Sequence, residues 1–320
     1  MKLTIIIPNF NGAHFLKPCL DSLRSQTFQD FKILLVDNGS SDESLSLVES
    51  GYPEVSILKF SRNRGFAAAV NAGIRAADTP YIMTLNNDTL VEPHCIGRLM
   101  AAIQTDPCIF SAGALILSRS LPVRTDTSGD FYNLFGYAFC RDQGLPMRRR
   151  PCRNVFTNCG CACIYRRELL QETGFFDPRF FAYLEDVDLG IRARLLGYRN
   201  ICCQKAIVYH TGSGTTGSKY TPFKVFCSAR NNIWLRQKNL SMLQRLFHAP
   251  LFFGGTVAKY LYFHKMGLHL WYLRGILQGI RHPVHPESSF ANVSPWRLEP
   301  WIFYGTVLYV FQYLRRRLIS

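Results

Sequence analysis

The stretch "LTIIIPNFNG", residues 3–12, indicates the fold class of this chain. It begins with the apolar run Leu3–Ile7, which Pro8 ends. A run in which polar residues do not alternate is typical of a strand buried on both faces, as in a parallel sheet. Apolar residues then recur at helical spacing between Phe15 and Leu23, which predicts an amphipathic helix reaching about Gln26. A buried strand followed by a helix is the unit from which α/β folds are built.

The same unit recurs along the first part of the chain. Further strands are expected at 31–36, 55–60, 81–85 and 109–117, with helices beginning near residues 41 and 65 and after Pro93. This alternation predicts a doubly wound, mostly parallel, Rossmann-like sheet. Residues 118–154 lack the pattern and are expected to form loops. Beyond them, Cys159, Cys161 and Cys163 are expected on one face of a strand, as small buried residues rather than metal ligands.

Polar residues follow several of these strands at the point where each strand ends. Asn9, Asp37 and Asn63 each come just after an apolar run. Ligands of doubly wound sheets bind beyond the carboxyl ends of the strands, so these positions are expected to line a site. Asp37 and Asn38 can hydrogen-bond a pyrimidine base, although a turn that caps the next helix explains the same residues.

The stretch "NRGFAAAVNAGI", residues 63–74, is expected to begin a helix that contacts the same ligand. It places Asn63, Gly65 and Asn71 at the start of that helix. Gly65 lets the backbone approach a ligand closely, and the free N–H groups of a helix start favour a diphosphate. The stretch lacks the G-x-G-x-x-G pattern of dinucleotide enzymes, which argues against an oxidoreductase.

Asn86, Asn87 and Asp88 follow the strand at 81–85. Sugar-nucleotide enzymes often hold a divalent cation at such a place with two carboxylates spaced Asp-x-Asp. Here the first carboxylate is replaced by the amide of Asn86, so the stretch is either a metal site with an altered first position or a simple turn after a strand. Hard cations prefer oxygen ligands, and one carboxylate can suffice when a diphosphate adds others.

Three carboxylates, Glu185, Asp186 and Asp188, cluster at the expected start of a helix. The helix dipole stabilises anions there, and an apolar stretch before the cluster suits a carboxylate tuned as a general base. The alternative is a plain helix start in which Arg192 pairs with Asp188 four residues away. His210 follows a strand and precedes "TGSGTTG", residues 211–217, which is expected to act as a lid that closes over a ligand.

The net charge of +15 is concentrated near the C-terminus. Residues 221–320 carry 13 Lys and Arg against 2 Asp and Glu, whereas residues 1–220 carry 24 against 20. Two uncharged runs, 246–258 and 300–314, are shorter than the ~18–20 residues that span a bilayer. Aromatic and apolar residues bordered by basic ones favour an anionic membrane surface over nucleic acid. The alternative is a helical subdomain packed on the catalytic domain.

The chain has eleven cysteines, and their expected oxidation state depends on the cell compartment of the protein. The residues after Met1 form a strand cut by Pro8 rather than the apolar core of a secretory signal. Reduced thiols in the cytoplasm are therefore expected, with the chain peripheral on the inner face of the cell membrane.

Taken together, these stretches resemble the family 2 glycosyltransferases of GT-A fold, most closely the rhamnosyltransferase-like branch that builds bacterial surface polysaccharides. The resemblance covers about residues 3–240 and rests on seven stretches that occur in family order. They are "IIIPNFNG", "VDNGSSD", "NRGFAAAVNAGI", "LNNDT", "GFFDPRFFAYLEDVDLGIRARLLGY", "VYHTGSG" and "ARNNIWLRQKN". It implies a GT-A catalytic domain at 1–223, with a nucleotide-sugar half at 1–117 and an acceptor half at 118–223. A basic, aromatic, helical region follows at 224–320.

The resemblance also implies an activity and roles for residues. The activity is inverting transfer of a sugar from a nucleotide-diphosphate donor, dTDP-rhamnose or a UDP-sugar, to a glycan or lipid-linked oligosaccharide. Asp186 would be the base, with Glu185 and Asp188 shaping its site, and Asp88 and His210 would ligate Mg²⁺ or Mn²⁺. The donor would contact Pro8, Asn9, Asn11, Asp37, Asn38, Asn63, Gly65, Asn71, Asn86 and Asn87.

Two other functions share some of these features. A nucleotidyltransferase uses similar metal and diphosphate chemistry, but it is expected to carry a Gly-rich, lysine-bearing loop after the first strand, and "PNFNGAHF" is not one. A membrane-associated, non-catalytic sugar-binding protein would not need Asp88, Asp186 and His210 together.

Overall fold

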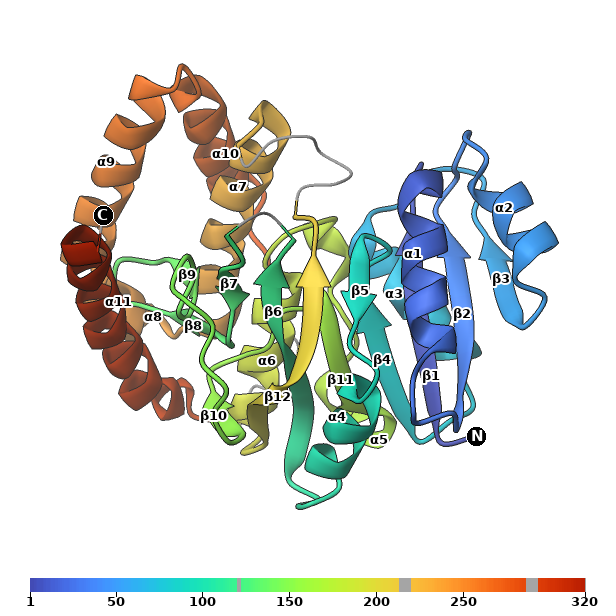
Figure 1. Ribbon diagram of the computed structural model, residues 1–320. Coiled ribbons are helices and arrows are strands. Elements are labelled where there is room, and N and C mark those ends of the chain that lie inside the picture. The colour runs from blue at the N-terminus through green and yellow to red at the C-terminus, as the bar shows by residue number, and fades with distance from the viewer. Residues whose placement is uncertain (120–121, 213–219, 286–292, 320) are drawn as a thin grey trace.

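The computed structural model describes residues 1–119, 122–212, 220–285 and 293–319. Its centre is a ten-stranded sheet in which eight strands follow the order β10-β12-β6-β11-β4-β1-β2-β3, while β5 pairs with β12 and β7 with β6 (Figure 1). The first half contains β1 (Leu3–Asn9), α1 (Ala13–Arg24), β2 (Phe31–Asp37), α2 (Ser44–Gly51), β3 (Val55–Lys59), α3 (Phe66–Ala76), β4 (Tyr81–Leu85), β5 (Thr89–Val91), α4 (Cys95–Ile103) and β6 (Ile109–Ser118).

The second half adds short strands and a group of helices. Its elements are β7 (Thr125–Thr127), β8 (Asp130–Tyr132), β9 (Ala138–Cys140), β10 (Arg153–Val155), β11 (Ala162–Arg166), α5 (Arg167–Thr173), α6 (Glu185–Leu195), β12 (Arg199–His210), α7 (Pro222–Asn239), α8 (Met242–Phe247), α9 (Ala249–Lys265), α10 (His269–Arg281) and α11 (Glu299–Ile319).

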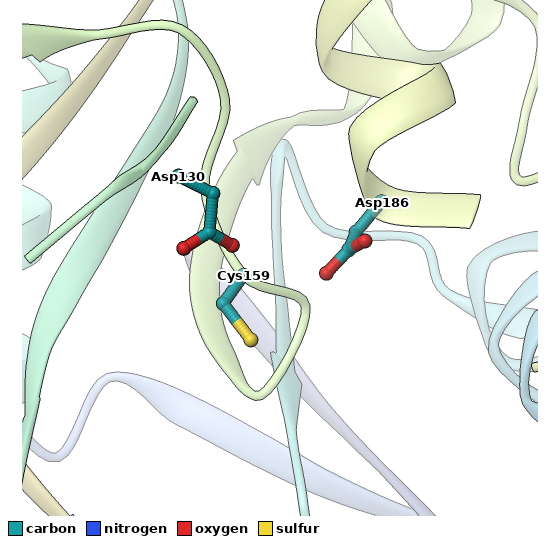
Figure 2. Close-up of side chains that lie close together, drawn as sticks. All are labelled: Asp130, Cys159 and Asp186. Atoms are coloured by element: carbon teal, nitrogen blue, oxygen red, sulfur yellow. The ribbon is translucent and has the colours of Figure 1, made fainter. Parts of the chain in front are cut away.

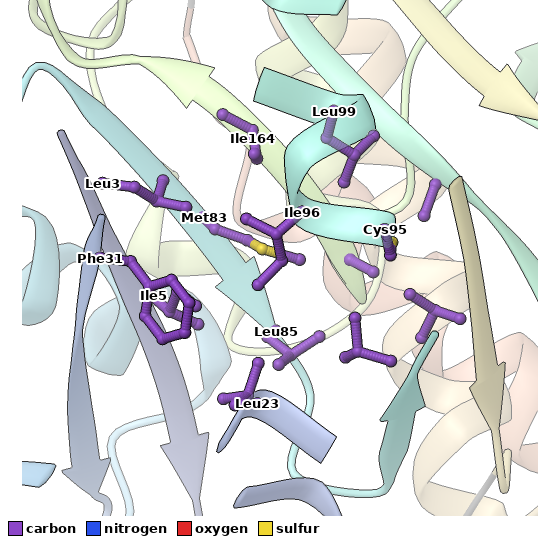
Figure 3. Packing of buried hydrophobic residues seen from close by; sticks show 14 of the residues in the cluster. Leu3, Ile5, Leu23, Phe31, Met83, Leu85, Cys95, Ile96, Leu99 and Ile164 are labelled. Carbon is purple, nitrogen blue, oxygen red and sulfur yellow. The ribbon is translucent and has the colours of Figure 1, made fainter. Parts of the chain in front are cut away.

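The predicted α/β class with a mostly parallel sheet is confirmed. β1 pairs in parallel with β2 and β4, β2 with β3, and β6 with β12. β11 is antiparallel to both of its neighbours, β4 and β6. Helices cover both faces of the sheet, so each face has its own buried apolar cluster. Figure 3 shows the cluster on the α1 and α4 side, where Leu3, Met83 and Ile96 meet.

Pro8 does not end the first strand as the sequence suggested. β1 continues to Asn9, and its last two residues pair with Val36 and Asp37 of β2. On its other side, β1 pairs with β4 only as far as Ile6. A residue without an N–H is tolerated where the ladder on one side has already ended. The extension pairs Asn9 with Asp37 at the carboxyl ends of β1 and β2.

The loop expected at 118–154 is wrong in part, because the segment contains β7, β8, β9 and β10. Each of these strands has only three residues, too few to show a period of two. The expected strand of alternating cysteines is also wrong in part. β11 begins at Ala162, so only Cys163 lies in it, and Cys159 and Cys161 belong to the segment before it.

The C-terminal helices pack against the rest of the chain at one end of the sheet (Figure 1). Leu298 and Ile302 share a buried cluster with Phe131 of β8 and Trp234 of α7. α7 also packs along α10. Among the described residues, none of the helices is long and apolar enough to cross a membrane.

Candidate active site

The carboxyl ends of β1 and β2 hold a chain of polar contacts. The Asn9 amide donates to Asp37 Oδ1 at 3.2 Å and accepts from the Asn87 amide at 2.6 Å. The Ser40 N–H donates to Asp37 Oδ2 at 3.0 Å. Asn9, Asp37 and Asn87 are all buried. Residues predicted to contact the nucleotide-sugar therefore come from three separate stretches and meet at the carboxyl ends of the strands, with Pro8 next to them in β1.

Asn11 shapes the turn beside this chain. It adopts a left-handed backbone conformation (φ 50°), which asparagine tolerates better than most residues. Its side-chain oxygen accepts from the Ser41 N–H at 2.8 Å, and its own N–H donates to Ser40 Oγ at 2.9 Å. These bonds tie the turn after β1 to the turn after β2.

Asn38 organises the backbone before α3. Its amide donates to Asn63 Oδ1 at 3.0 Å and to the Gly65 carbonyl at 3.2 Å, and its oxygen accepts from the Arg64 N–H at 2.9 Å. Gly65 has φ +85°, and a Cβ there would lie 2.5 Å from the Phe181 carbonyl oxygen. This position therefore requires glycine for its conformation and for close contact with the 181–184 segment.

Asn71 does not lie at a helix start, so that expectation is wrong. α3 begins at Phe66, which places Asn71 in the middle of the helix. Its amide donates to the Phe176 carbonyl at 2.6 Å and its oxygen accepts from the Phe176 N–H at 3.0 Å. Both polar atoms of this buried side chain thus fasten the segment after α5, and its contact with the donor stays a prediction without geometric support.

Asp88 and His210 lie next to each other although 122 positions separate them. β5 runs antiparallel to the end of β12 and pairs Thr89 with His210. This places His210 Nε2 3.2 Å from Asp88 Oδ1, while His210 Nδ1 lies 3.1 Å from Asp126 Oδ2. Asn86 precedes the pair, and its N–H donates to the Cys161 carbonyl at 2.8 Å. The predicted metal residues are therefore neighbours, and their ligation of a metal stays a prediction.

The pair suits a divalent cation in its chemistry. One carboxylate oxygen and one imidazole nitrogen face each other, a donor set that Mn²⁺ accepts more readily than Mg²⁺ does. Burial disfavours the protonated imidazole, but Cys161 and the carboxylates of Asp126 and Asp88 outweigh it and raise the pKa of His210. Positive charge is thus favoured between these carboxylates. A lid was expected at 211–217, and its residues 213–217 lie outside the described part of the chain.

The backbone before Asp186 is strained. Phe181, Tyr183 and Leu184 have φ values of 63°, 71° and 70°, a region that residues with side chains seldom adopt. Such conformations persist only where the surroundings hold them, and they gather at functional sites. Asn231 of α7 supplies that support. Its buried amide donates to the carbonyls of Phe180 at 3.0 Å, Ala182 at 2.9 Å and Tyr183 at 2.7 Å.

Asn231 lies in the stretch "ARNNIWLRQKN", but residue type and spacing indicated no role for it, because that role depends on contacts across about fifty residues. Asn231→Ala is expected to lower the free energy of unfolding by about 2–4 kcal/mol, since it removes the donor that Asn231 supplies to the carbonyls of Ala182 and Tyr183. It should also lower kcat at least tenfold by releasing the segment that positions Asp186. Urea unfolding and initial rates measure the two effects.

Asn232→Ala is the matched control for this variant. Asn232 is the adjacent residue, and the oxygen of its side chain has no hydrogen-bond partner in the described part of the chain. The control should leave both stability and kcat close to those of the parent. Equal effects of the two substitutions would show that Asn231 does not hold the segment.

Asp186 is fixed by backbone donors at the first turn of α6. The Gly160 N–H donates to its Oδ2 at 2.9 Å and the Val187 N–H to its Oδ1 at 2.8 Å. Burial raises the pKa of Asp186, and these bonds oppose the rise. The side chain is of intermediate exposure, and the two bonds set the orientation of its carboxylate. That combination suits a general base.

Glu185 differs from its neighbour in protonation. Its side chain is 6 % exposed, and its Oε2 has no hydrogen-bond partner among the described residues. Burial, followed by the charge of Asp186, raises the pKa of Glu185 to about 8. Glu185 is therefore protonated at neutral pH and unsuited to act as a base there.

Asp188 is enclosed in a buried ion-pair network. Arg192 Nε, Lys238 Nζ and the Asn239 amide each lie 2.9 Å from its carboxylate oxygens. Lys238 also contacts Asp177 at 2.9 Å. The alternative foreseen for this position, an ion pair with Arg192, is thus present. Every oxygen of Asp188 is occupied by protein, so its contacts are those of a residue that joins α6 to α7.

Two further polar side chains lie close to Asp186. Asp130 of β8, Cys159 and Asp186 present one oxygen, one sulfur and one oxygen that all lie within 4.8 Å of one another (Figure 2). Burial, followed by the charge of Asp186, raises the pKa of Asp130 to about 7. A hydrogen bond from Thr127 Oγ1, at 2.6 Å, opposes this rise. Besides Asp88 and His210, this is a second grouping that could hold a metal ion. Sequence analysis missed Asp130 because it lies in the segment expected to be a loop.

Adjacent residues connect the two halves of the site. The Gly160 N–H donates to the carboxylate of Asp186. The carbonyl of Cys161 accepts from the N–H of Asn86, two positions before Asp88. The segment before β11 therefore touches both the candidate base and the candidate cation site. The two candidate sites therefore lie close together, beyond the carboxyl ends of the strands.

Comparison with known proteins gives a consistent result. The family model described as "Glycosyl transferase family 2" matches residues 4–174. The chain is 27% identical to an N-acetylglucosaminyl-diphospho-decaprenol L-rhamnosyltransferase of Mycobacterium tuberculosis, covering 73% of this chain and 86% of that protein. It is 32% identical to a PGL/p-HBAD biosynthesis glycosyltransferase of Mycobacterium bovis, covering 59% of this chain and 68% of that protein.

A solved structure shares the fold. GalNAc-T7, crystallised with UDP, GalNAc and Mn²⁺, superposes with a TM-score of 0.63 at 17% sequence identity, over 78% of this chain. The chain spans half the length of that protein. The GT-A type of α/β fold expected from the sequence is thereby confirmed.

Proposed function

Because this chain belongs to glycosyl transferase family 2, we propose that it is an inverting, metal-dependent enzyme that moves a sugar from a nucleoside-diphosphate donor to a glycan or lipid-linked acceptor. dTDP-rhamnose and UDP-sugars are the donors we propose, in the biosynthesis of cell-surface polysaccharide. The observation that carries the proposal is the link through Gly160 and Cys161 between Asp186 and the Asp88–His210 pair.

The reaction needs one base and one cation. Asp186 takes the proton of an acceptor hydroxyl, whose oxygen forms a bond to the anomeric carbon of the donor sugar while the bond to the diphosphate breaks. Asp88 and His210 would hold a divalent cation, and such a cation would supply positive charge to stabilise the leaving diphosphate. A base and a cation suit direct displacement, whereas glycoside hydrolysis requires a pair of carboxylates.

The donor is expected to bind along the contacts that join β1, β2 and α3. We propose that Asp37 and Asn38 recognise the base and ribose of the donor, and that the backbone near Gly65, at the start of α3, approaches its diphosphate. We propose Asn9, Asn11, Asn63, Asn86 and Asn87 as the residues that hold this surface in shape.

Asp88→Asn is expected to abolish the cation-dependent part of donor binding, because it replaces the carboxylate among the proposed ligands. For the parent chain, UDP or dTDP with Mn²⁺ should raise Tm more than either does alone, since ligands stabilise by mass action. With Asp88→Asn, adding Mn²⁺ to the nucleotide should change Tm little. Thermal shift with and without Mn²⁺ measures this.

Asp126→Asn is the matched control, because Asp126 contacts the other nitrogen of His210. It should keep most of the Mn²⁺-dependent shift. Loss of that shift in the control but not in Asp88→Asn would place the cation elsewhere, and a full shift with EDTA present would contradict the metal dependence.

We further propose that the C-terminal helices bind the inner face of an anionic membrane. Their large apolar side chains are exposed in stripes along single helix faces. Residues 270, 273, 277 and 280 form such a stripe on α10, and residues 303, 307, 310, 311 and 314 form one on α11. Large exposed apolar side chains also occur on α8, at Met242, Leu243, Leu246 and Phe247, and over about half the circumference of α9, at Leu251, Phe253, Val257, Leu261 and Tyr262. Exposed Lys265, Arg274 and Arg316 lie among them, as interfacial helices require.

Replacing Phe303 and Phe311 together by Ser is expected to lower partition onto anionic vesicles at least tenfold, since each is more than 60% exposed and would insert its ring into the interface. Co-sedimentation of the full chain with phosphatidylserine-containing vesicles measures this. The control replaces Val123 and Met147, which are exposed outside the C-terminal helices. Equal partition of both variants would contradict membrane binding through α11, and vesicle-independent self-association would indicate that a second copy covers the surface.

A further inference from the structure

Cys152 and Cys203 are two thiols that the proposed reaction does not use. Cys152 directly precedes β10 and is exposed, while Cys203 lies in β12 and is 1% exposed. β10 pairs antiparallel with β12, with Arg153 opposite Cys202 and Asn154 opposite Ile201. Continued by one position, the same register places Cys152 opposite Cys203.

Residues opposite each other in an antiparallel pair have Cα atoms about 4.5 or 5.5 Å apart, depending on their place in the ladder. Disulfides join cysteines whose Cα atoms are about 4.4–6.8 Å apart, so either spacing admits the bond without moving the strands. The two thiols also interact directly. A hydrogen bond from Cys203 lowers the pKa of Cys152 to about 7 and raises the pKa of Cys203.

The surroundings of Cys152 suit an anionic disulfide as reaction partner. Lys205 lies two positions after Cys203 and favours the Cys152 thiolate. The basic run Arg148–Arg150 ends two positions before Cys152, and Arg148 and Arg149 are exposed. Glutathione disulfide carries net negative charge, so these residues attract it to the exposed thiol.

We propose that Cys152 and Cys203 are a reversible thiol-modification site that reacts with glutathione disulfide and closes to a disulfide between β10 and β12. The Cys152 thiolate attacks one sulfur of glutathione disulfide, forms a mixed disulfide and releases one glutathione thiolate. Cys203, after losing its proton to water, then attacks the Cys152 sulfur and releases the second glutathione. Two protein thiols are thereby oxidised, and one disulfide is reduced to two glutathione molecules.

The cross-link would fasten the strand that leads into the acceptor side of the site. β10 is followed by Thr157 and Gly160, whose hydrogen bonds reach the backbone and the carboxylate of Asp186. The pairing of β10 with β12 spans only three residue pairs, at one end of the sheet. A disulfide at the entry of β10 therefore holds an edge that otherwise depends on a short ladder.

The test treats the reduced full-length chain with glutathione disulfide and maps the products by mass spectrometry without reduction. A cross-linked peptide pair containing Cys152 and Cys203 is expected in the parent and in Cys108→Ser, and it should be absent from Cys152→Ser. Cys108 is the control because it is the other exposed cysteine of the described chain. Cys203→Ser, checked for folding by its thermal melt, should retain glutathione on Cys152.

Alkylation provides a second readout that needs no buried substitution. At pH 7, Cys152 should react with iodoacetamide about 5- to 10-fold faster than Cys108, because the hydrogen bond from Cys203 and the charge of Lys205 lower the pKa of Cys152 to about 7. A parent chain that carries glutathione on Cys152 without the cross-link would overturn the proposal. Equal alkylation rates of Cys152 and Cys108 would overturn it as well.

Discussion

Asp186→Asn is expected to lower kcat by about 10²–10⁴-fold, the usual contribution of a general base, while donor binding remains intact. An asparagine at this position loses the hydrogen bond from the adjacent Val187 N–H but can still accept the one from the Gly160 N–H, which ties the start of α6 to the segment before β11. It cannot take the proton of an acceptor hydroxyl. Rates of nucleoside diphosphate release measure the loss, and the thermal shift with UDP or dTDP and Mn²⁺ measures donor binding.

Glu185→Gln is the matched control for this prediction. Glu185 is the adjacent carboxyl group, and with a pKa raised to about 8 it is protonated at pH 7, so the substitution leaves the charge unchanged. Its kcat should stay within a few-fold of the parent. If Glu185→Gln lost as much activity as Asp186→Asn, or if Asp186→Asn kept near-normal turnover, the assignment of the base would be wrong.

The pH profile of the parent adds an independent readout. A base works only when deprotonated, and burial raises the pKa of Asp186 above its ordinary value. Activity should therefore fall on the acid side at a higher pH than an ordinary aspartate would cause.

Asp188→Ala is expected to lower the free energy of unfolding by about 3–5 kcal/mol, although Asp188 lies only two residues from the proposed base. The substitution leaves Lys238 and Arg192 as buried cations with less compensating charge, and both side chains are 1% exposed. Asp177 remains as a carboxylate partner of Lys238. Urea unfolding measures the loss.

Glu49→Ala serves as the control, because Glu49 pairs with Lys59 at 2.6 Å while both side chains are 52% exposed. Exposed pairs contribute about 0–1 kcal/mol, so this variant should unfold close to the parent. Acid should reproduce the effect of Asp188→Ala. Burial raises the pKa of Asp177 and Asp188, but their cationic partners outweigh it and lower both pKa values in the folded chain. The two carboxylates therefore contribute their full stabilisation above the unfolded pKa, near 4. This stabilisation is lost as the pH falls below that value. Equal stabilities of the two variants would show that the network does not hold α6 to α7.

The parallel half of the fold could be predicted from sequence because its strands are long and apolar. β1, β2 and β4 are buried on both faces, which removes polar residues from whole runs and makes each strand visible in the sequence. The three-residue strands between β6 and β11 offer no such signal. Their positions are set by pairing with distant segments, as when Asp130 bridges to Thr157.

The site shows the same division. Asp88, Asp186 and His210 stood out because they belong to stretches with a recognisable order, and the pairing of β5 with β12 then explains why Asp88 and His210 meet. Asn231 and Asp130 contribute through contacts across the fold, which residue type and spacing do not reveal. Asp188 looked like its neighbours in sequence, and only its buried partners on α7 set it apart.

The proposed reaction is tested most directly by release of nucleoside diphosphate from a panel of dTDP-, UDP- and GDP-sugars, with Mn²⁺ and a lipid extract as acceptor. Family membership and the linked base and cation site predict release from at least one donor, coupled to transfer of its sugar to the extract. The release should be lost with EDTA and in Asp186→Asn. Release that is no faster in the parent than in Asp186→Asn, for every donor, would contradict the account and indicate a sugar-binding protein without catalysis.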